Sequence, residues 1–410
     1  MIDLNSLKVN PDWASLPLFE RTGWARVRFG DVVANLNETE RNPGEAGIDR
    51  FIGLEHLEPG SLHVSKWGNV ADGTTFTRRC RPGQVLFGKR RAYQRKVAVA
   101  EFDAVVSGDI YVLAPKNRLI RELLPFLCLS ERFFQHAVGT SAGSLSPRTN
   151  WSSLASFEFD LPPVEQQRFI AEILCVADEF ESKSWHLHKE LTGFFQSLAS
   201  DLFCKLALRQ NSFVKLTEVL ARQPQSGIYK GPMYVGRGVK TVNMAELFGN
   251  EVIDRSVSMQ RMDLSTDEVR KYSLTPHDLL FGRRSIVLEG AGKCSMVGAL
   301  DEPTAFESSI LRVTVDPEKV SSRFVFEWFN SPNGSKEIRR IRSFTTIAGI
   351  SGSALRSVRV PLPQGRRQAE IVQKLGEVRS AHAAIAQELI EAGRLKTGLI
   401  EALLGATNVV

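Results

Sequence analysis

The apolar residues of the chain follow a helical period in two long segments. The first segment carries them at Phe169, Ile173, Val176, Phe180, Leu187, Leu191, Phe194, Leu198 and Leu202, with a break at Lys183. The second carries them at Ile371, Leu375, Val378, Ile385, Leu389, Ala392, Leu399 and Leu403, with His382 and Lys396 at the same spacing. Steps that alternate between about four and three residues are typical of a helix packed lengthwise on another helix. Pro163 suits the start of the first helix, where its missing N–H costs nothing.

The segments that precede these helices have a mixed pattern. Short β-branched runs between turn residues, such as "KVAVAEFDAVVSGDIYVLAP" from Lys96 and "SSILRVTV" from Ser308, predict strands. "RELLPFLCLSERFFQHAVG" from Arg121 and "SRFVFEWFNSPNGSKEIRRI" from Ser322 have helical spacing and contain Gly or Pro stops. Each segment is therefore expected to fold as a mixed α/β block.

The same order of blocks occurs twice along the chain. "PGQVLFGKRRAY" from Pro82 resembles "PHDLLFGRRSIV" from Pro276, and "LPPVEQQRFIAEIL" from Leu161 resembles "PLPQGRRQAEIVQKL" from Pro361. The offset is 194 residues from Leu86 to Leu280 and 201 residues from Leu161 to Leu362. A period of this length is far too long for a solenoid and indicates a duplicated pair of domain and helix.

The duplication suggests how the long helices are covered. Each helix has one broad apolar stripe that needs a partner, and the other copy is the nearest one. An approximate two-fold relation between the copies makes the helices antiparallel and puts the globular blocks at opposite ends of the pair. The alternative is that each helix packs only on its own globular block.

We therefore expect an α+β fold with a pseudo-two-fold internal duplication, in which two mixed α/β globular domains are separated by two long antiparallel helices. The predicted boundaries are residues 1–160 for the first domain, 161–207 for the first long helix, 208–361 for the second domain and 362–410 for the second long helix.

Composition limits the class of protein. A chain of 410 residues with 43% apolar residues has room for two or three domains. Its formal charge of +6 and pI of about 9.1 permit an acidic partner such as nucleic acid but do not establish one. The five cysteines are widely spaced without a C-x-x-C, so we expect neither a zinc site nor a disulfide framework. With no signal pattern and no apolar run of about 18 residues, we expect a cytoplasmic protein without a membrane span.

The strongest charge signal is "TRRCRPGQVLFGKRRAYQRK", from Thr77 to Lys96, which holds eight basic residues and no acidic one. Lys and Arg neutralise phosphates, and Arg and Gln can read base edges. A solvated charged face is the alternative interpretation. The second copy keeps Arg283 and Arg284 but adds Asp278 and Glu289, so the two blocks share a scaffold and differ in surface residues. Readers of two different sequences are expected to differ in this way.

The sequence offers no catalytic or metal-binding constellation. "LEGAGKCS" lacks the first glycine of a phosphate loop, because Val287 stands there, and Cys294 replaces its Ser or Thr. His186 and His188, two positions apart on a predicted helix, point to different faces. "NPDW" at Asn10 lacks the second proline of the amino-methylating motif it begins like. We therefore predict that the chain by itself is not an enzyme.

The chain resembles the specificity subunit of type I restriction-modification systems over essentially its full length. The resemblance rests on "WARVRFGDVVANLNE", "FIGLEHLEPGSLHVSKWG", the "GQVLFGKRRAYQRK" block and the two helix starts of the form Leu-Pro-x-x-x-x-Gln. That form is matched by Leu161, Pro162 and Gln167, and less fully by Leu362, Pro363 and Gln368, where Arg366 and Arg367 replace a Glu-Gln pair.

The resemblance implies two target recognition domains that each read one half of a split duplex DNA site. It implies that the long helices form a spacer and dock two DNA adenine methyltransferase subunits, with restriction subunits joining through them. S-adenosylmethionine, ATP and Mg²⁺ are then expected in the partner subunits and no cofactor in this chain. The implied DNA contacts are Arg78, Arg79, Lys89, Arg90, Arg91, Tyr93, Arg95 and Lys96 for the first half-site and Arg283 and Arg284 for the second, with the loops near Ser144 and Ser351 close to DNA.

Three other functions stay open at this point. The chain could serve a methyltransferase-only or type II-like modification system, or be a standalone nuclease whose site is not recognisable. It could also be a scaffold that binds only protein, with its basic run solvated. Cleavage or methylation by the pure chain would identify an enzyme, and a steep salt dependence of duplex binding would exclude the scaffold.

Overall fold

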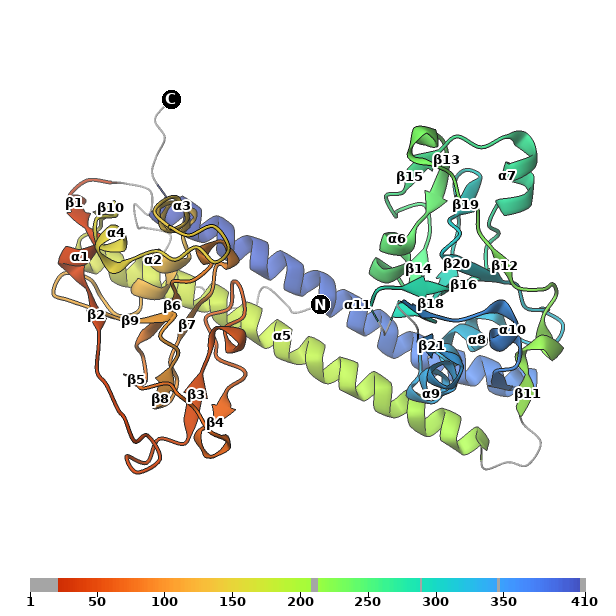
Figure 1. Cartoon of the computed structure of the whole chain (residues 1–410), viewed down its shortest axis with the longest axis horizontal. Coiled ribbons are helices and arrows are strands. Elements are labelled where there is room, and N and C mark those ends of the chain that lie inside the picture. Colours follow the sequence, from red (N-terminus) through yellow and green to blue (C-terminus); the bar gives the residue numbers. More distant parts are fainter. Residues whose placement is uncertain (1–20, 208–212, 288–289, 345–346, 406–410) are drawn as a thin grey trace. The chain divides into compact units, whose positions relative to one another are not determined.

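The computed structural model describes residues 21–207, 213–287, 290–344 and 347–405 (Figure 1). It divides into two compact units. Unit 1 consists of Met1–Leu187 and Ile385–Val410, and unit 2 of His188–Ala384. Each unit contains one mixed domain and a part of both long helices, so the units cut across the predicted domain boundaries.

The first mixed domain contains two four-stranded sheets, ordered β2-β9-β6-β7 and β4-β3-β8-β5, and the pair β1-β10. Its strands are β1 (Ala25–Arg28), β2 (Val33–Leu36), β3 (Arg50–Ile52), β4 (Gly68–Asn69), β5 (Arg78–Cys80), β6 (Val85–Gly88), β7 (Val97–Val99), β8 (Ala104–Val106), β9 (Ile110–Pro115) and β10 (Glu158–Leu161). Its helices are α1 (Phe29–Val32), α2 (Leu124–Leu129), α3 (Glu131–Gly139) and α4 (Trp151–Ala155).

The second mixed domain is built around a five-stranded sheet, ordered β12-β20-β16-β18-β14. Its strands are β11 (Phe213–Lys215), β12 (Gln225–Ser226), β13 (Val235–Val242), β14 (Val252–Ile253), β15 (Gln260–Met262), β16 (Leu279–Gly282), β17 (Arg284–Ser285), β18 (Cys294–Val297), β19 (Thr304–Phe306), β20 (Ile310–Val313), β21 (Ser343–Phe344), β22 (Ala348–Gly349) and β23 (Arg359–Pro361). Its helices are α6 (Met244–Gly249), α7 (Thr266–Tyr272), α8 (Ser322–Phe329), α9 (Pro332–Ile341) and α10 (Gly352–Arg356).

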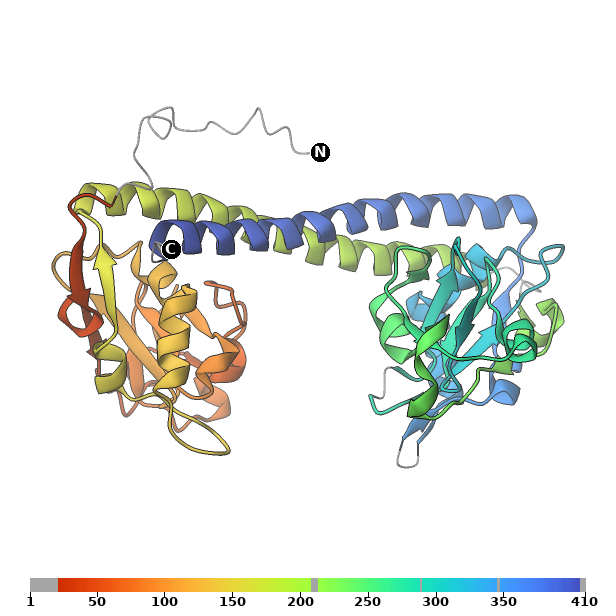
Figure 2. The same ribbon diagram turned by 90° about the horizontal axis from the view of Figure 1, so that it is seen from above.

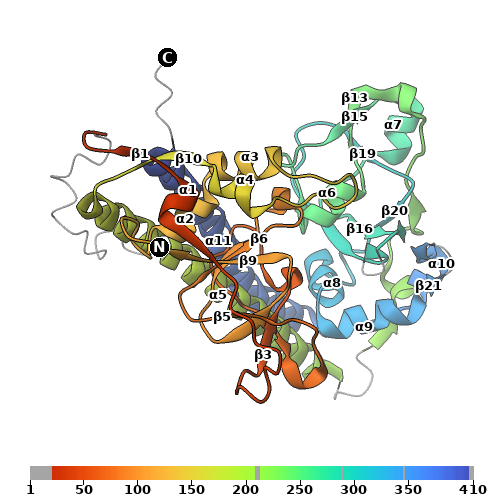
Figure 3. The same ribbon diagram turned by 60° about the vertical axis from the view of Figure 1, so that its left-hand side comes forward.

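The duplication predicted from the sequence is visible in the strand pairing. In the first domain the buried strand β6 pairs antiparallel with β9, and in the second the buried strand β16 pairs antiparallel with β20 (Figure 3). Both are the Leu-Phe-Gly strands of the repeat, and Phe87 and Phe281 are fully buried in the two cores. The alternation of apolar and turn residues that predicted strands thus produces the same central ladder twice.

The two long helices are α5 (Val164–Ala207) and α11 (Gly365–Leu404). In unit 1 Asp178 pairs with Lys396 and Ser184 donates to Glu388, so α11 runs antiparallel to α5. In unit 2 Thr192 and His382 are 2.8 Å apart, in the same antiparallel sense. The predicted antiparallel pairing is therefore confirmed. Each helix also packs on a mixed domain, because Ile170 and Leu174 of α5 lie in the core of the first domain and Ile371 and Leu375 of α11 lie in that of the second.

One glutamine explains the repeated motif at the helix starts. The buried amide of Gln167 accepts from the backbone N–H of Ile120 and donates to the carbonyl of Pro162. Gln368 accepts from the backbone N–H of Ser321 and donates to the carbonyl of Pro363. Each of these three positions is offset by 201 residues between the copies, so both long helices are joined to their domains by the same hydrogen bonds.

Replacing this glutamine is expected to destabilise the unit that contains it. Gln167→Ala leaves a buried N–H and carbonyl without partners, which costs about 1–3 kcal/mol in the free energy of unfolding. Urea denaturation followed by circular dichroism measures the loss. Gln196→Ala, at an exposed position of α5, is the matched control and should cost less than about 0.5 kcal/mol. Equal losses in the two variants would contradict the role of Gln167.

The predicted apolar stripe is correct for the second long helix and, except at Leu202, wrong for the first. In α11 the residues Ile371, Leu375, Ala392, Lys396 and Leu403 are buried as predicted. In α5 the predicted positions Val176, Leu187 and Phe194 are 43%, 41% and 55% exposed. Of the predicted positions in α5 only Leu202 is buried. The other buried residues of the described helix are Gln167, Ile170, Ala171, Leu174, Ala177, Asp178, Ser184, Phe195, Ala199, Phe203 and Leu206.

The error has a physical cause. Apolar residues stand side by side in α5, as at Ile173–Leu174 and Phe194–Phe195, so the same period can be followed in two registers. The buried register contains small residues such as Ala171 and Ala199, which allow another element to approach closely but add little to a count of hydrophobicity. The fold buries the register whose small residues allow the closer packing.

Among the described residues no helix combines the length and apolarity that crossing a membrane requires.

Candidate nucleic-acid interface

Three basic residues, Lys89, Arg90 and Arg91, directly follow the end of β6. The backbone N–H of Lys89 donates to Asp109 at 2.9 Å, and its carbonyl accepts from Thr149 at 3.0 Å. Arg91 donates its N–H to Pro147 at 2.7 Å and has a left-handed backbone, φ +53°. The segment Lys89–Arg91 is therefore fixed between the turn at Asp109 and the loop that ends at Thr149.

The side chains of this segment meet at one carboxylate. Asp109 lies 3.3 Å from the guanidinium of Arg90 and 2.8 Å from that of Arg148. Arg90 and Arg91 both donate to Ser146 Oγ, at 3.1 and 3.5 Å. The ammonium of Lys89 lies 4.9 Å from the ring centre of Tyr111, over which Arg78 also lies. We call Arg78, Lys89, Arg90, Arg91 and Arg148 the basic cluster.

The basic cluster has more positive charge than its surroundings neutralise. Partial burial lowers the pKa of Lys89, and the neighbouring Arg78 adds to this shift. Burial opposes ionisation of Asp109, but Arg148 and Arg90 outweigh it and lower the pKa of that carboxyl. Asp109 pairs with Arg90 and Arg148, two of the five cations, so a bound anion such as a phosphate would relieve the repulsion that remains in the cluster.

The other predicted contacts of the first copy are not in the cluster. Arg79 is held by Asp103 at 3.2 Å, Arg95 by Glu131, and the ammonium of Lys96 by the carbonyl of Leu54 at 2.6 Å. These cations are engaged in fixing the domain. Tyr93 follows the cluster in a short turn and is 56% exposed, so its ring is open to a ligand.

The second copy repeats the backbone of the site with fewer charges. Arg283 donates its N–H to Ser309 at 2.7 Å and accepts from Ile350 at 2.9 Å, as Lys89 does with Asp109 and Thr149. Arg284 is exposed in β17 and pairs with Gly349 of β22. Arg283 and Arg284 therefore occupy the places of Lys89 and Arg90, at the end of the equivalent strand.

Sequence reasoning missed Arg148, Asp109 and Ser146. Arg148 is an isolated cation far from the basic run, and only the fold brings it to Asp109. The loop near Ser144 was expected close to DNA, and it lies between Ala142 and Arg148, within the site. Ser351 serves as the N-cap of α10, where its Oγ accepts from the N–H of Ala354 at 3.0 Å. Asn10 of the "NPDW" segment lies outside the described residues.

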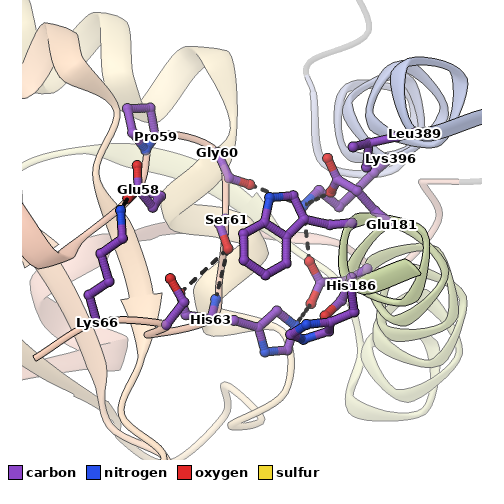
Figure 4. Close-up of a pocket in the computed structure, with 14 residues that line it drawn as sticks. Glu58, Pro59, Gly60, Ser61, His63, Lys66, Glu181, His186, Leu389 and Lys396 are labelled. Atoms are coloured by element: carbon purple, nitrogen blue, oxygen red, sulfur yellow. Dashed lines mark hydrogen bonds and ion pairs between the residues drawn. The ribbon is translucent and has the colours of Figure 1, made fainter. Parts of the chain in front are cut away.

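Within the described ranges no three histidine, cysteine or acidic side chains gather in a way that could hold a metal ion. The ring of His188 lies 4.2 Å from that of His382 in unit 2, whereas His186 lines a pocket of unit 1 (Figure 4). The two histidines thus point to different surroundings, as their spacing predicted.

That pocket adjoins a charge network that fixes the first mixed domain to the long helices. His63 lies 3.2 Å from Asp178 and 3.1 Å from Glu101. Lys396 is 4% exposed, and its ammonium donates to Asp178 at 2.9 Å and to the carbonyl of Gly60 at 3.0 Å, and also pairs with Glu181 (Figure 4). The loop around Gly60 is therefore bound to both α5 and α11 within unit 1.

This network should make the stability of unit 1 depend on pH. The hydrogen bond to Asp178 outweighs burial and, with Glu101, raises the pKa of His63 from 6.5 to about 9. Because the folded pKa is raised, the stabilisation by His63 is complete below pH 6.5 and is lost as the pH rises through about 9. In urea denaturation, wild type should exceed His63→Gln in stability at about pH 6, and the difference should shrink by about pH 9.5. A constant difference would contradict the proposed charge on His63.

Comparisons with known proteins give one consistent family. The sequence profile of the type I restriction modification DNA specificity domain matches residues 69–192. The specificity subunit of the type I restriction enzyme MjaVIII of Methanocaldococcus jannaschii is 23% identical over 391 residues, which covers 87% of this chain and 86% of that protein. The specificity subunit of the EcoDI enzyme of Escherichia coli is 25% identical over 214 residues, which covers 48% of this chain and 45% of that protein.

Among solved structures, the S subunit of a type I restriction-modification system from M. genitalium matches with a TM-score of 0.60 at 12% identity, over 94% of this chain and 97% of that one. This likeness is one of fold, and it agrees with the α+β duplication. The relatives are named specificity subunits, which agrees with the prediction of a recognition subunit. The duplicated mixed domain, the repeated helix start and matches along most of the chain thus make it similar to the type I restriction-modification specificity subunits.

Proposed function

We propose that the chain reads a bipartite, asymmetric duplex DNA target, one half with each mixed domain. The observation that carries this proposal is the equivalence of Lys89 and Arg90 with Arg283 and Arg284. These cations follow the same strand and pair with the same loop in both units, while the residues around them differ. A shared scaffold with different side chains suits two readers of different sequences.

The chemistry of the basic cluster fits duplex DNA. Arg and Lys contacts to phosphates position a protein on the duplex, and Arg side chains that reach a base edge favour guanine. Arg91 has Ser146 as its hydrogen-bond partner and no carboxylate partner among the described residues, so it is available to an incoming phosphate or base. We infer that the cluster fixes the register of the duplex and that Tyr93 lies beside it.

We further propose that α5 and α11 dock two DNA adenine methyltransferase subunits, and through them the restriction subunits. Support comes from the apolar face of α5 that the structure leaves exposed. Val176 and Leu187 of unit 1 are eleven residues apart, about three helical turns, and so lie on one face. An exposed apolar face of this kind is typical of a protein interface. S-adenosylmethionine, ATP and Mg²⁺ then belong to the partner subunits.

Mapping methylated adenines in the genome of a host that expresses the chain with its methyltransferase tests the proposal. We expect one split motif with two constant halves and a gap of fixed length. Exchange of residues 25–155 for the block of another family member should change one half and leave the other half and the gap unchanged. Methylation of a continuous motif, or changes in both halves after the exchange, would contradict the bipartite proposal.

The runner-up proposal is a subunit of a methyltransferase-only or type II-like modification system. The same mapping applies to it, but no restriction subunit takes part. An assay of the chain purified with its partners distinguishes the two proposals, because ATP-dependent cleavage of unmethylated target DNA requires the restriction subunit. Cleavage by the pure chain would instead favour a standalone nuclease.

A further inference from the structure

A leucine stands at the tip of a tightly closed loop beside the basic cluster. Leu145 is 91% exposed, among the most exposed large apolar residues of the chain. The loop is closed at its base by two 3.0 Å hydrogen bonds between Ala142 and Arg148. In unit 1 the loop projects from the side of the mixed domain that faces away from α5 and α11 (Figure 2).

The cluster itself holds this tip in place. Ser146, next to Leu145, accepts from both Arg90 and Arg91, and the carbonyl of Pro147 accepts the N–H of Arg91. An apolar side chain is thus presented to solvent by a loop whose partners are cations. Leu145 is too exposed to contribute to the packing of the core. Because the tip is already fixed, it loses little conformational entropy when it becomes buried in a complex.

Unit 2 presents aliphatic side chains at the equivalent place. Ile286 is 92% exposed and Ile347 is 46% exposed. The register of β17 and β22 pairs Arg284 with Gly349 and Ser285 with Ala348, so its continuation sets Ile286 opposite Ile347. The hairpin of β21 and β22 also points away from the long helices of its unit (Figure 2). Both units therefore place branched aliphatic residues beside the cations that follow the Leu-Phe-Gly strand.

We propose that Leu145 in the first domain, and Ile286 with Ile347 in the second, insert as apolar wedges between stacked base pairs of the target. This proposal rests on the proposed function, since it requires duplex DNA at both sites. The cations of each site hold the phosphates on either side, and the apolar faces of two base pairs cover the aliphatic side chain. The free energy lost by unstacking is offset by the burial of the wedge and by phosphate contacts that bent DNA allows.

The free energy of unstacking also determines which base-pair step the wedge enters most easily. Pyrimidine–purine steps such as TA and CA/TG unstack most easily, so each half-site should contain one where the wedge enters. The wedge therefore contributes to specificity without a hydrogen bond to a base edge.

The experiment uses the complex of the full chain with its methyltransferase and a duplex that carries the mapped target. 2-Aminopurine is placed at successive positions of each half-site, except at the methylated adenines, and its fluorescence is measured at saturating protein. Wild type should raise the fluorescence at one step in each half-site. Leu145→Ala should abolish the rise in one half-site, keep the rise in the other, and weaken binding about 10-fold.

Ile286→Ala combined with Ile347→Ala should give the mirror result, with loss in the other half-site alone. Met233→Ala is the matched control, because it removes an apolar side chain that is 81% exposed and lies outside both wedges and both long helices, and it should leave both signals intact. Specific binding by wild type without a rise, or a rise that persists in the wedge variants, would overturn the wedge and leave the proposed function standing.

Loss of methyltransferase from purified Leu145→Ala would also overturn the wedge, because it would make the tip a protein contact. Failure of the wild-type complex to bind the mapped duplex would overturn the proposed function itself.

Discussion

Reversing two charges of the basic cluster is expected to abolish recognition of one half-site. In the double variant Lys89→Glu and Arg91→Glu, two cations near the phosphates become anions, and the affinity for the target duplex should fall by about two orders of magnitude at physiological salt. Neither side chain has a carboxylate partner within hydrogen-bond distance among the described residues, so the fold should tolerate the change. Fluorescence anisotropy with the methyltransferase complex measures the loss.

A control with the same net charge separates local contact from general repulsion. Lys116→Glu with Arg121→Glu changes two exposed cations of the same unit that lie outside the cluster and bind backbone carbonyls. This control should retain most of the affinity. Similar losses in both variants would mean that net charge, rather than the basic cluster, governs binding.

The second large effect concerns stability. Lys396→Met should lower the free energy of unfolding of unit 1 by about 3–5 kcal/mol, because it removes the partner of a buried carboxylate. Asp178 is 9% exposed and, among the described residues, would keep only His63, at 3.2 Å, as a cationic partner. Urea denaturation that follows the fluorescence of unit 1 tryptophans measures the change.

Two further variants test whether the unpaired charge causes this loss. Adding Asp178→Asn to Lys396→Met should recover part of the stability, since the orphaned charge is gone. Lys183→Met removes an exposed lysine of α5 that pairs with the exposed Glu179, and should change stability by less than about 0.5 kcal/mol. If the double variant is less stable than Lys396→Met, the pair does not act as described.

The sequence predicted the duplication, both long helices and their antiparallel pairing, because these depend on local periodicity and on matching blocks. It did not predict which face of α5 is buried, since adjacent apolar residues such as Phe194 and Phe195 support two registers. The candidate site was predicted as one charged run. The fold divides that run into cations held by acids, such as Arg79 with Asp103, and a cluster completed by the distant Arg148. The number of charged residues in a short segment does not show which of them will pair with residues that are distant in the sequence.

The core of the first domain has a consequence for the order of events during synthesis. Ile400 and Leu403 of α11 pack in the same core as Ile170, Leu174 and the strands that precede them. The ribosome makes these two residues more than two hundred positions later, after the whole second domain. The core of the first domain therefore lacks these side chains until the end of the chain emerges. Translation that stops early leaves it without them, and such a fragment should be a substrate for proteolysis rather than a rival for DNA.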